Sequence, residues 1–337
     1  MIPLLNTNKR KIAGLVLGIG LLCVSFVSSI VFGVTEIRFV NAVYSFLDYN
    51  ALSDEHVIIQ TTRVPRALIA AVVGSNLAVA GALMQVLTRN PLASPSIFGI
   101  NAGAIFCVIV AITLFKLSAL QQLMWVAFGG AALAALAVYV LGSIGRGGLT
   151  PLKTVLAGAA VSALFSAFSQ GMLALNEAGL QDVLFWLAGS VSGRTTDILY
   201  PVLPYMAVGG IAAFTLARQV TILASGDDIA KGLGQRTVLI KCLLAVTVVL
   251  LAGSSVAVAG SIGFIGLVIP HIARYFVGVD YRWTIPYCAL LGAILLLWAD
   301  ILIRFPIPPQ ELPVGVVTAF IGTPFFIYIA RRGFRSE

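Results

Sequence analysis

Residues 67–87 read ALIAAVVGSNLAVAGALMQVL, a stretch of 21 residues without a charged side chain. About 20 apolar residues in a helix span a hydrocarbon core about 30 Å thick, so this stretch can cross a membrane. The whole chain of 337 residues is 59% hydrophobic and 10% charged, with a mean hydropathy of +1.02. Ten apolar stretches can be read from it, at 12–32, 67–87, 96–115, 122–141, 152–175, 199–216, 238–258, 262–277, 284–303 and 312–330. The sequence predicts an all-α integral membrane protein of about ten transmembrane helices.

The basic residues predict the orientation of these helices. An even number of spans places both termini on one side, and cytoplasmic loops carry an excess of lysine and arginine. With both termini cytoplasmic, 15 of the 21 lysines and arginines but only four of the 13 acidic residues lie inside. The net charge of +8 is then explained by topology, so lipid is the expected surrounding and nucleic acid is not an expected partner.

Motifs of enzymes and metal centres are missing from this chain. The sequence has no phosphate-binding loop and no nucleophile elbow, and its two histidines, His56 and His271, lie far apart. We therefore expect no catalytic residue, no metal site and no cofactor bound by the chain itself. An ion-coupled secondary transporter is the alternative of a different class, but such proteins keep ionisable groups near the bilayer midplane. Here the main exception is Asp300 with Arg304, which can pair at the outer end of the ninth stretch.

The loops between the spans are too short to hold a soluble domain, so residues 1–337 are expected to form a single transmembrane domain. The longer loops are 33–66 and 176–198 on the outside and 219–237 on the inside. Within the second of these, residues 183–191 are apolar but too short to cross a membrane. They predict either a surface or re-entrant helix near a pore mouth, or simple interfacial packing.

A short internal sequence repeat indicates that the chain consists of two related halves. Residues 78–81 and 257–260 both read AVAG, and a proline follows ten residues after each glycine, at Pro91 and Pro270. The two copies lie in spans of opposite direction, as an inverted repeat requires.

Small and mildly polar residues follow one face of the fifth span. Gly158, Ser162 and Ser166 recur every four residues, and Gln170 continues the series. This pattern is typical of close helix packing, and it equally suits the smooth wall of a substrate path.

Several longer motifs resemble one family, the permeases of binding-protein-dependent ABC importers for iron siderophores, haem and cobalamin. The resemblance extends from about residue 60 to the C-terminus. The motifs are RVPR at 63–66, GALMQ at 81–85, RNPLASP at 89–95, FGINAGA at 98–104, GSIGFIGLVIPHIAR at 260–274, WAD at 298–300 and ELPVGVVT at 311–318.

This resemblance implies a fold, a setting and a set of partners. The fold would be the inverted-repeat type II permease of an ABC importer in the bacterial cytoplasmic membrane. The partners would be a second permease chain, like or unlike, two cytoplasmic subunits that hold ATP and Mg²⁺, and an extracytoplasmic substrate-binding protein. The path would run between the two permeases along spans five and ten, which favours Ser162, Ser166 and Gln170 as lining residues. The cargo would be an iron(III) siderophore, with haem or cobalamin as alternatives.

The inner loop carries a segment that resembles the coupling helices by which such permeases engage their ATPases. Residues 225–235 read SGDDIAKGLGQ. Gly226 before Asp227 and Asp228 suits a helix start, and Gly234 suits a helix end. We expect Ala230 to take part in coupling together with these four residues, unless the segment is an ordinary capped connector.

Three arginines stand at the outer ends of spans two and nine. Arg63 and Arg66 flank Pro65 in a helix start, where positive charge opposes the helix dipole and so is not explained by local stability. Together with Arg304, they are expected to be exposed and to dock carboxylates of the substrate-binding protein, as the resemblance implies. Interfacial anchoring is the alternative.

Overall fold

The computed structural model describes residues 3–33, 35, 37–144, 150–175, 183, 186–306 and 311–333, and this part of the chain folds into helices without a strand. The α-helices are α1 Asn8–Val31, α2 Phe39–Leu47, α3 Asp54–Ile58, α4 Val64–Thr88, α5 Ile100–Thr113, α6 Leu120–Ser143, α7 Pro151–Leu175, α9 Thr196–Thr215, α10 Ala217–Ala224, α11 Asp227–Gly232, α12 Thr237–Val248, α13 Ser254–Ala259, α14 Ile265–Val277, α15 Tyr281–Leu302 and α16 Val314–Gly333. The predicted all-α class is confirmed for these residues.

Seven helical segments of the described chain are long and apolar enough to cross a membrane. They include two composite segments, because a π-helical turn joins α3 to α4 and another joins α12 to α13. Three shorter apolar helices, α5, α14 and α16, lie where the sequence predicts the third, eighth and tenth spans. The predicted spans therefore coincide with helices, but α5 and α14 are shorter than expected.

Left-handed backbone at single residues explains the two short helices. Gly99 has a φ of +67° and ends a 3₁₀ turn directly before α5. Phe264 has a φ of +66° directly before α14, where the Ile265 N–H donates to the Gly263 carbonyl over 2.8 Å. A helix cannot continue through such residues, so α5 has 14 residues and α14 has 13. These lengths correspond to about 20 Å, less than the thickness of a hydrocarbon core.

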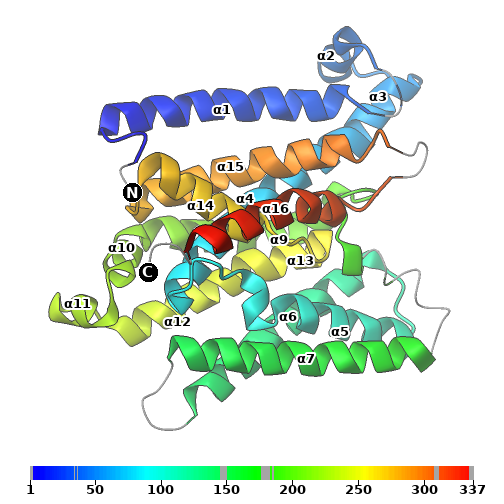
Figure 1. Ribbon diagram of the computed structural model, residues 1–337. Helices are drawn as coiled ribbons and strands as arrows, with labels where there is room; N and C mark the ends of the chain where they lie inside the picture. Colours follow the sequence, from blue (N-terminus) through cyan, green and yellow to red (C-terminus); the bar gives the residue numbers. More distant parts are fainter. Residues whose placement is uncertain are drawn as a thin grey trace.

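Helix α4 forms the centre of the bundle, packed between α14 and α15 (Figure 1). In its apolar window 78% of the residues are buried, against 17% in α1. Glycine allows this close packing. A Cβ atom at Gly81 would lie 1.9 Å from the Gly266 carbonyl oxygen, and one at Gly74 would lie 2.3 Å from that of Gly292. Because the backbones touch directly, α4 and its two neighbours form a rigid unit.

Helix α1 lies at the edge of the bundle and packs on α15 (Figure 1). The Tyr287 hydroxyl donates to the Lys11 carbonyl over 2.8 Å, and the Trp298 indole N–H donates to the Ser25 hydroxyl over 3.0 Å. The rest of α1 exposes large apolar side chains such as Val16 and Leu17, as expected for a helix that faces lipid.

The two ends of the bundle carry different short helices. Helix α1 begins, and α16 ends, at the end that carries α10 and α11, whereas α2 and α3 lie at the opposite end (Figure 1). We call the first the inner end and the second the outer end, after the predicted charge distribution.

Candidate functional site

The faces of α7 and α16 that other helices leave uncovered form the candidate path surface. Both helices lie on the near side of the bundle in Figure 1. On α7, Ser166 and Gln170 are exposed, together with the small residues Ala159 and Ala163. A helix turns by about 100° per residue, so these four share one face. On the described part of α16, Phe320 is 82% exposed.

The remaining residues of the predicted series lie deeper. Gly158 is buried, and Ser162 is half-buried, with its hydroxyl 3.4 Å from the position of a Cβ atom at Gly99. The structure therefore divides the series into a packing half and an exposed half. The burial of Gly158 and the partial burial of Ser162 agree with close packing, and a substrate path along Ser166 and Gln170 stays a prediction.

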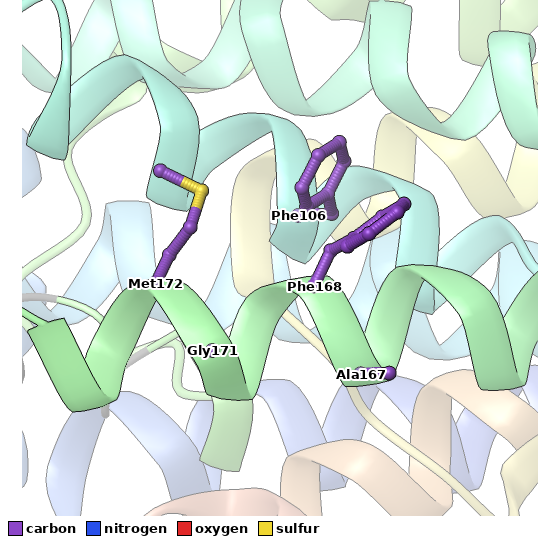
Figure 2. Close-up of a pocket in the computed structure, with 5 residues that line it drawn as sticks. All are labelled: Phe106, Ala167, Phe168, Gly171 and Met172. Carbon is purple, nitrogen blue, oxygen red and sulfur yellow. The ribbon is translucent and has the colours of Figure 1, made fainter.

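An apolar hollow of about 430 Å³ lies beside this face, between α5 and α7. Figure 2 shows Phe106 of α5 next to Phe168 of α7, with Met172 one turn further along the same helix. The side chains that line it offer no strong hydrogen-bond donor, so this hollow is suited to lipid or to an apolar surface and does not select a polar ligand.

At the inner end, α11 is attached firmly to the rest of the chain through Asp227. Its carboxylate pairs with Arg89 over 2.9 Å and with Lys241 over 2.7 Å. Burial would raise the pKa of Asp227, but the hydrogen bonds and charges of these two cations hold it below its ordinary value. Arg89 caps the inner end of α4 and Lys241 belongs to α12, so α11 is fixed to the central helix.

The predicted coupling residues divide into supporting and exposed positions. Gly226 and Gly234 have positive φ values of +123° and +79° at the two ends of α11, and Asp228 is exposed. Ala230 is fully buried against its own chain, and its part in coupling stays a prediction. Its small side chain lets α11 lie close to the bundle.

Two large apolar residues are exposed on α11 and at its C-cap, Ile229 at 55% and Leu233 at 68%. Sequence reasoning missed them. Their spacing of four residues, with Ala230 on the other side, is the signal that could have found them. A cavity of about 560 Å³ opens beside α11, lined by both polar and apolar residues, among them Arg89, Arg274 and Val279. The inner end thus offers a short helix that exposes two large apolar side chains beside the charged Asp228 and Lys231.

At the outer end, the three arginines expected to be exposed are buried. Arg66 pairs with Asp300 over 2.8 Å and with Glu311 over 2.8 Å. Arg304 also pairs with Asp300, as the spacing of four residues predicts, and donates to the Ser29 carbonyl over 2.7 Å. We call Arg66, Asp300, Arg304 and Glu311 the outer charge cluster. It joins α1, α4, α15 and the segment before α16.

Arg63 lies beside this cluster but binds backbone instead of carboxylate. Its guanidinium donates to the carbonyl groups of Ile30, Val31 and Thr35 at the end of α1. The last carbonyls of a helix have no partner within the helix, and Arg63 supplies one. The expectation that Arg63, Arg66 and Arg304 stand exposed is therefore wrong, because other parts of the same chain satisfy their charges. Docking through them stays a prediction.

Glu311 connects this cluster to the start of α16. Burial would raise its pKa, but hydrogen bonds from Arg66 and Ser192 and the charges of Arg66 and Arg304 hold the pKa of Glu311 below its ordinary value. The carboxylate thus stays ionised at neutral pH, and it holds the head of α16 against α4. Sequence analysis counted Glu311 only as one of the outer acidic residues.

The apolar outer segment 183–191, for which a surface or re-entrant helix and simple interfacial packing were both expected, is described at Val183 and from Trp186 onward, and its residues 186–188 are helical. The Ser261 N–H donates to the Trp186 carbonyl over 3.0 Å, and the Gly315 N–H donates to the Gly189 carbonyl over 3.2 Å. The segment therefore packs directly against the start of α16 and the turn before α14. Residues 184 and 185 lie outside the described residues.

Comparisons with known proteins agree with this architecture. Residues 21–332 match the FecCD transport family. The chain is 53% identical to a Bacillus subtilis protein named "Probable siderophore transport system permease protein YfiZ", over 93% of this chain and 96% of that protein. It is 47% identical to the B. subtilis iron(3+)-hydroxamate import system permease protein FhuB, over 94% and 83%. A solved structure described as "An inward-facing conformation of a putative metal-chelate type ABC transporter" superposes with a TM-score of 0.83 at 27% identity, covering 94% of this chain and 98% of that one.

Proposed function

The chain belongs to the FecCD transport family, and from this membership we propose that it is the permease subunit of an ABC importer that carries an iron(III) siderophore into the cytoplasm. It would act as a multi-pass protein of the bacterial cytoplasmic membrane. Hydrolysis of ATP, with its Mg²⁺, would take place on partner subunits, so this chain would contribute movement and a path but no catalytic residue.

The single observation that carries the proposal is the construction of α11. Asp227 joins this helix to α4 and α12, while Ile229 and Leu233 face away from the chain. A short helix that is fixed to the central helix on one side and apolar on the other is suited to transmit a displacement from a cytoplasmic ATPase. We propose one such contact for each of two ATPase subunits and two permease chains.

The path would lie between the two permease chains, along the exposed face of α7 and along α16. Ser166 and Gln170 would line it, and Ser162 would support its wall. A smooth, weakly polar wall without a selective pocket suits a large chelate that passes without binding tightly. The substrate-binding protein would approach the outer end, which the buried Arg63, Arg66 and Arg304 hold in shape.

A growth experiment tests the cargo. A strain that lacks this chain would be grown on limiting iron with purified siderophores, haem or cobalamin supplied singly, with and without the restored gene. We expect the gene to restore growth on at least one iron(III) siderophore. Restored uptake of cobalamin alone, or of haem alone, would show that the iron assignment is wrong.

A reconstitution experiment tests the energy source. Liposomes would contain the permease with its ATPase subunits and binding protein, or the permease alone. We expect uptake only in the complete system. It should also require ATP on the side of the membrane where the ATPase subunits lie. Uptake by the permease alone, driven by an ion gradient, would contradict the proposal.

A further inference from the structure

Arg194 is a buried cation without a counter-charge at the outer end. The side chain is 6% exposed, and it makes no hydrogen bond or ion pair with the described part of the chain. Its Nε atom is buried and has no acceptor. Its one close partner is the indole ring of Trp186, which is 2% exposed and whose centroid lies 5.2 Å from the Arg194 Cζ atom.

The other buried arginines of the outer end differ from Arg194 in this respect. Arg66 and Arg304 pair with carboxylates, and Arg63 donates to carbonyl groups. A buried guanidinium without such partners is unfavourable, because desolvation penalises its charge. Burial lowers the pKa of Arg194 to about 10, which still leaves the side chain charged at neutral pH. The cation–π contact offsets part of the cost but leaves the hydrogen-bond donors of the guanidinium unused.

The backbone before Arg194 is held in place at several points. The Ser190 N–H donates to the Ala259 carbonyl over 2.8 Å, in addition to the contacts of Trp186 and Gly189 with the turn before α14 and with α16. Gly189 has a φ of +68°, and a Cβ atom there would lie 2.5 Å from the Ser261 carbonyl oxygen. At Gly315 of α16 a Cβ atom would lie 2.1 Å from the Ala188 carbonyl oxygen. The segment is fixed beside the head of α16, so Arg194 cannot easily move away to water.

We infer that Arg194 binds an anionic oxygen group of the transported chelate at the outer end of the path, beside the head of α16. This inference rests on the proposed function. A guanidinium binds a carboxylate or a similar pair of anionic oxygens through two parallel hydrogen bonds, and such charge-assisted bonds are the strong ones. The passing anion supplies the counter-charge that the described chain lacks, and Trp186 holds the cation in position.

Iron uptake from chelates of different charge tests the inference. A strain that lacks the native gene would express the wild type or Arg194→Gln, and uptake of radioactive iron would be measured from ferric citrate, from an anionic ferric tricatecholate and from a neutral ferric trihydroxamate. We expect Arg194→Gln to lower uptake of the anionic chelates at least about tenfold and to change uptake of the neutral one less than about twofold. Arg194→Lys, which keeps the charge, should restore part of the loss.

Two controls separate binding from folding. Arg38→Gln removes a charge from an exposed position of the same end and should leave the uptake of all three chelates unchanged. The thermal unfolding of purified Arg194→Gln should lie close to that of the wild type. An equal loss of uptake for anionic and neutral chelates in Arg194→Gln would overturn the inference. The inference would also fail if the wild-type protein took up the neutral chelate but neither of the anionic ones. Failure of the wild type to take up any iron chelate would instead contradict the proposed function.

Discussion

Asp300 is the residue on which the outer charge cluster depends. Its carboxylate is fully buried and pairs with both Arg66 and Arg304. Asp300→Asn removes the negative charge and leaves two buried guanidinium groups near each other, with Glu311 as their remaining acid. Breaking a buried pair in this way costs about 3 to 5 kcal/mol.

We therefore expect Asp300→Asn to lower the midpoint of thermal unfolding markedly in detergent, together with the yield of membrane-inserted protein. Glu311→Gln, at a half-exposed acid that contacts the same Arg66, serves as the matched control and should cost less. Equal midpoints for Asp300→Asn and the wild type would show that the cluster does not stabilise the fold.

The same cluster shows which contacts a sequence can predict. Asp300 and Arg304 lie one helical turn apart, so their pairing follows from the period of the helix. Arg66 and Asp300 are separated by 234 residues, and their contact depends on how α4 packs against α15. The sequence therefore predicted a charged outer end but placed Arg66 and Arg63 in solvent, because only the packed bundle brings their partners to them.

At the scale of the element, substitutions on the exposed and on the buried side of α11 can test whether this helix contacts the ATPase. Ile229 is exposed and Ala230, its neighbour, is fully buried. We expect Ile229→Asp to weaken association with the ATPase subunit while membrane insertion and thermal stability stay near those of the wild type. The reason is that the substitution removes an apolar contact from an exposed site and leaves the attachment of Asp227 intact.

Ala230→Asp is the comparison variant, and we expect it to destabilise the inner end itself, because it places an unpaired carboxylate in a buried position. Co-purification of the ATPase with each variant, beside its unfolding midpoint, separates the two effects. If Ile229→Asp and Leu233→Asp both retain the ATPase as well as the wild type does, α11 is not the contact helix.

Helix α4 depends on glycine where its backbone meets that of α14. A Cβ atom at Gly81 would lie 1.9 Å from the Gly266 carbonyl oxygen, so Gly81→Ala forces the helices apart. Overpacking of this kind costs about 1 to 3 kcal/mol. Gly210→Ala in α9 is the control, because a Cβ atom there meets nothing within 4 Å. The unfolding midpoint should fall for Gly81→Ala and stay constant or rise for Gly210→Ala; a fall of equal size in both would argue against the close contact.

Element boundaries were predicted unequally well. The apolar stretches of α1 and α15 are continuous, and each helix agrees with its predicted span within a few residues. The spans at 96–115 and 262–277 were predicted too long, because Gly99 and Phe264 have left-handed backbone conformations directly before α5 and α14, and a side chain like that of Phe264 rarely adopts one. Apolarity alone does not reveal where such a backbone interrupts a helix.

On the scale of the whole molecule, one face of α7 would line the proposed path and the opposite face would not. Ser166 and Leu164 are both exposed, and their directions differ by about 160° around the helix. We expect Ser166→Phe to lower iron-chelate uptake strongly, because a large side chain narrows the path. Leu164→Phe places the same phenyl side chain on the other side of α7 and should leave uptake nearly unchanged, since that side faces lipid or neighbouring helices.

Uptake would be measured in cells at equal amounts of membrane-inserted permease. Gln170→Phe, one turn further along the same face as Ser166, should act in the same direction as Ser166→Phe. Normal uptake by both Ser166→Phe and Gln170→Phe would place the path elsewhere, and the strip on α7 would then be a packing surface alone.

The position of α1 at the edge of the bundle also determines when the fold can be completed. Its contacts with α15, through Lys11, Ser25 and Ser29, join residues that are 273 to 276 positions apart. At 5 to 20 residues per second, the ribosome needs roughly 14 to 55 s to make the chain between them. During that interval α1 resides in the bilayer without the Arg304 side chain that will bind the carbonyl groups of Ser29 and Phe32. Helix α1 is thus made early but fixed late, because its contacts with Tyr287, Trp298 and Arg304 can form only after those residues have been made.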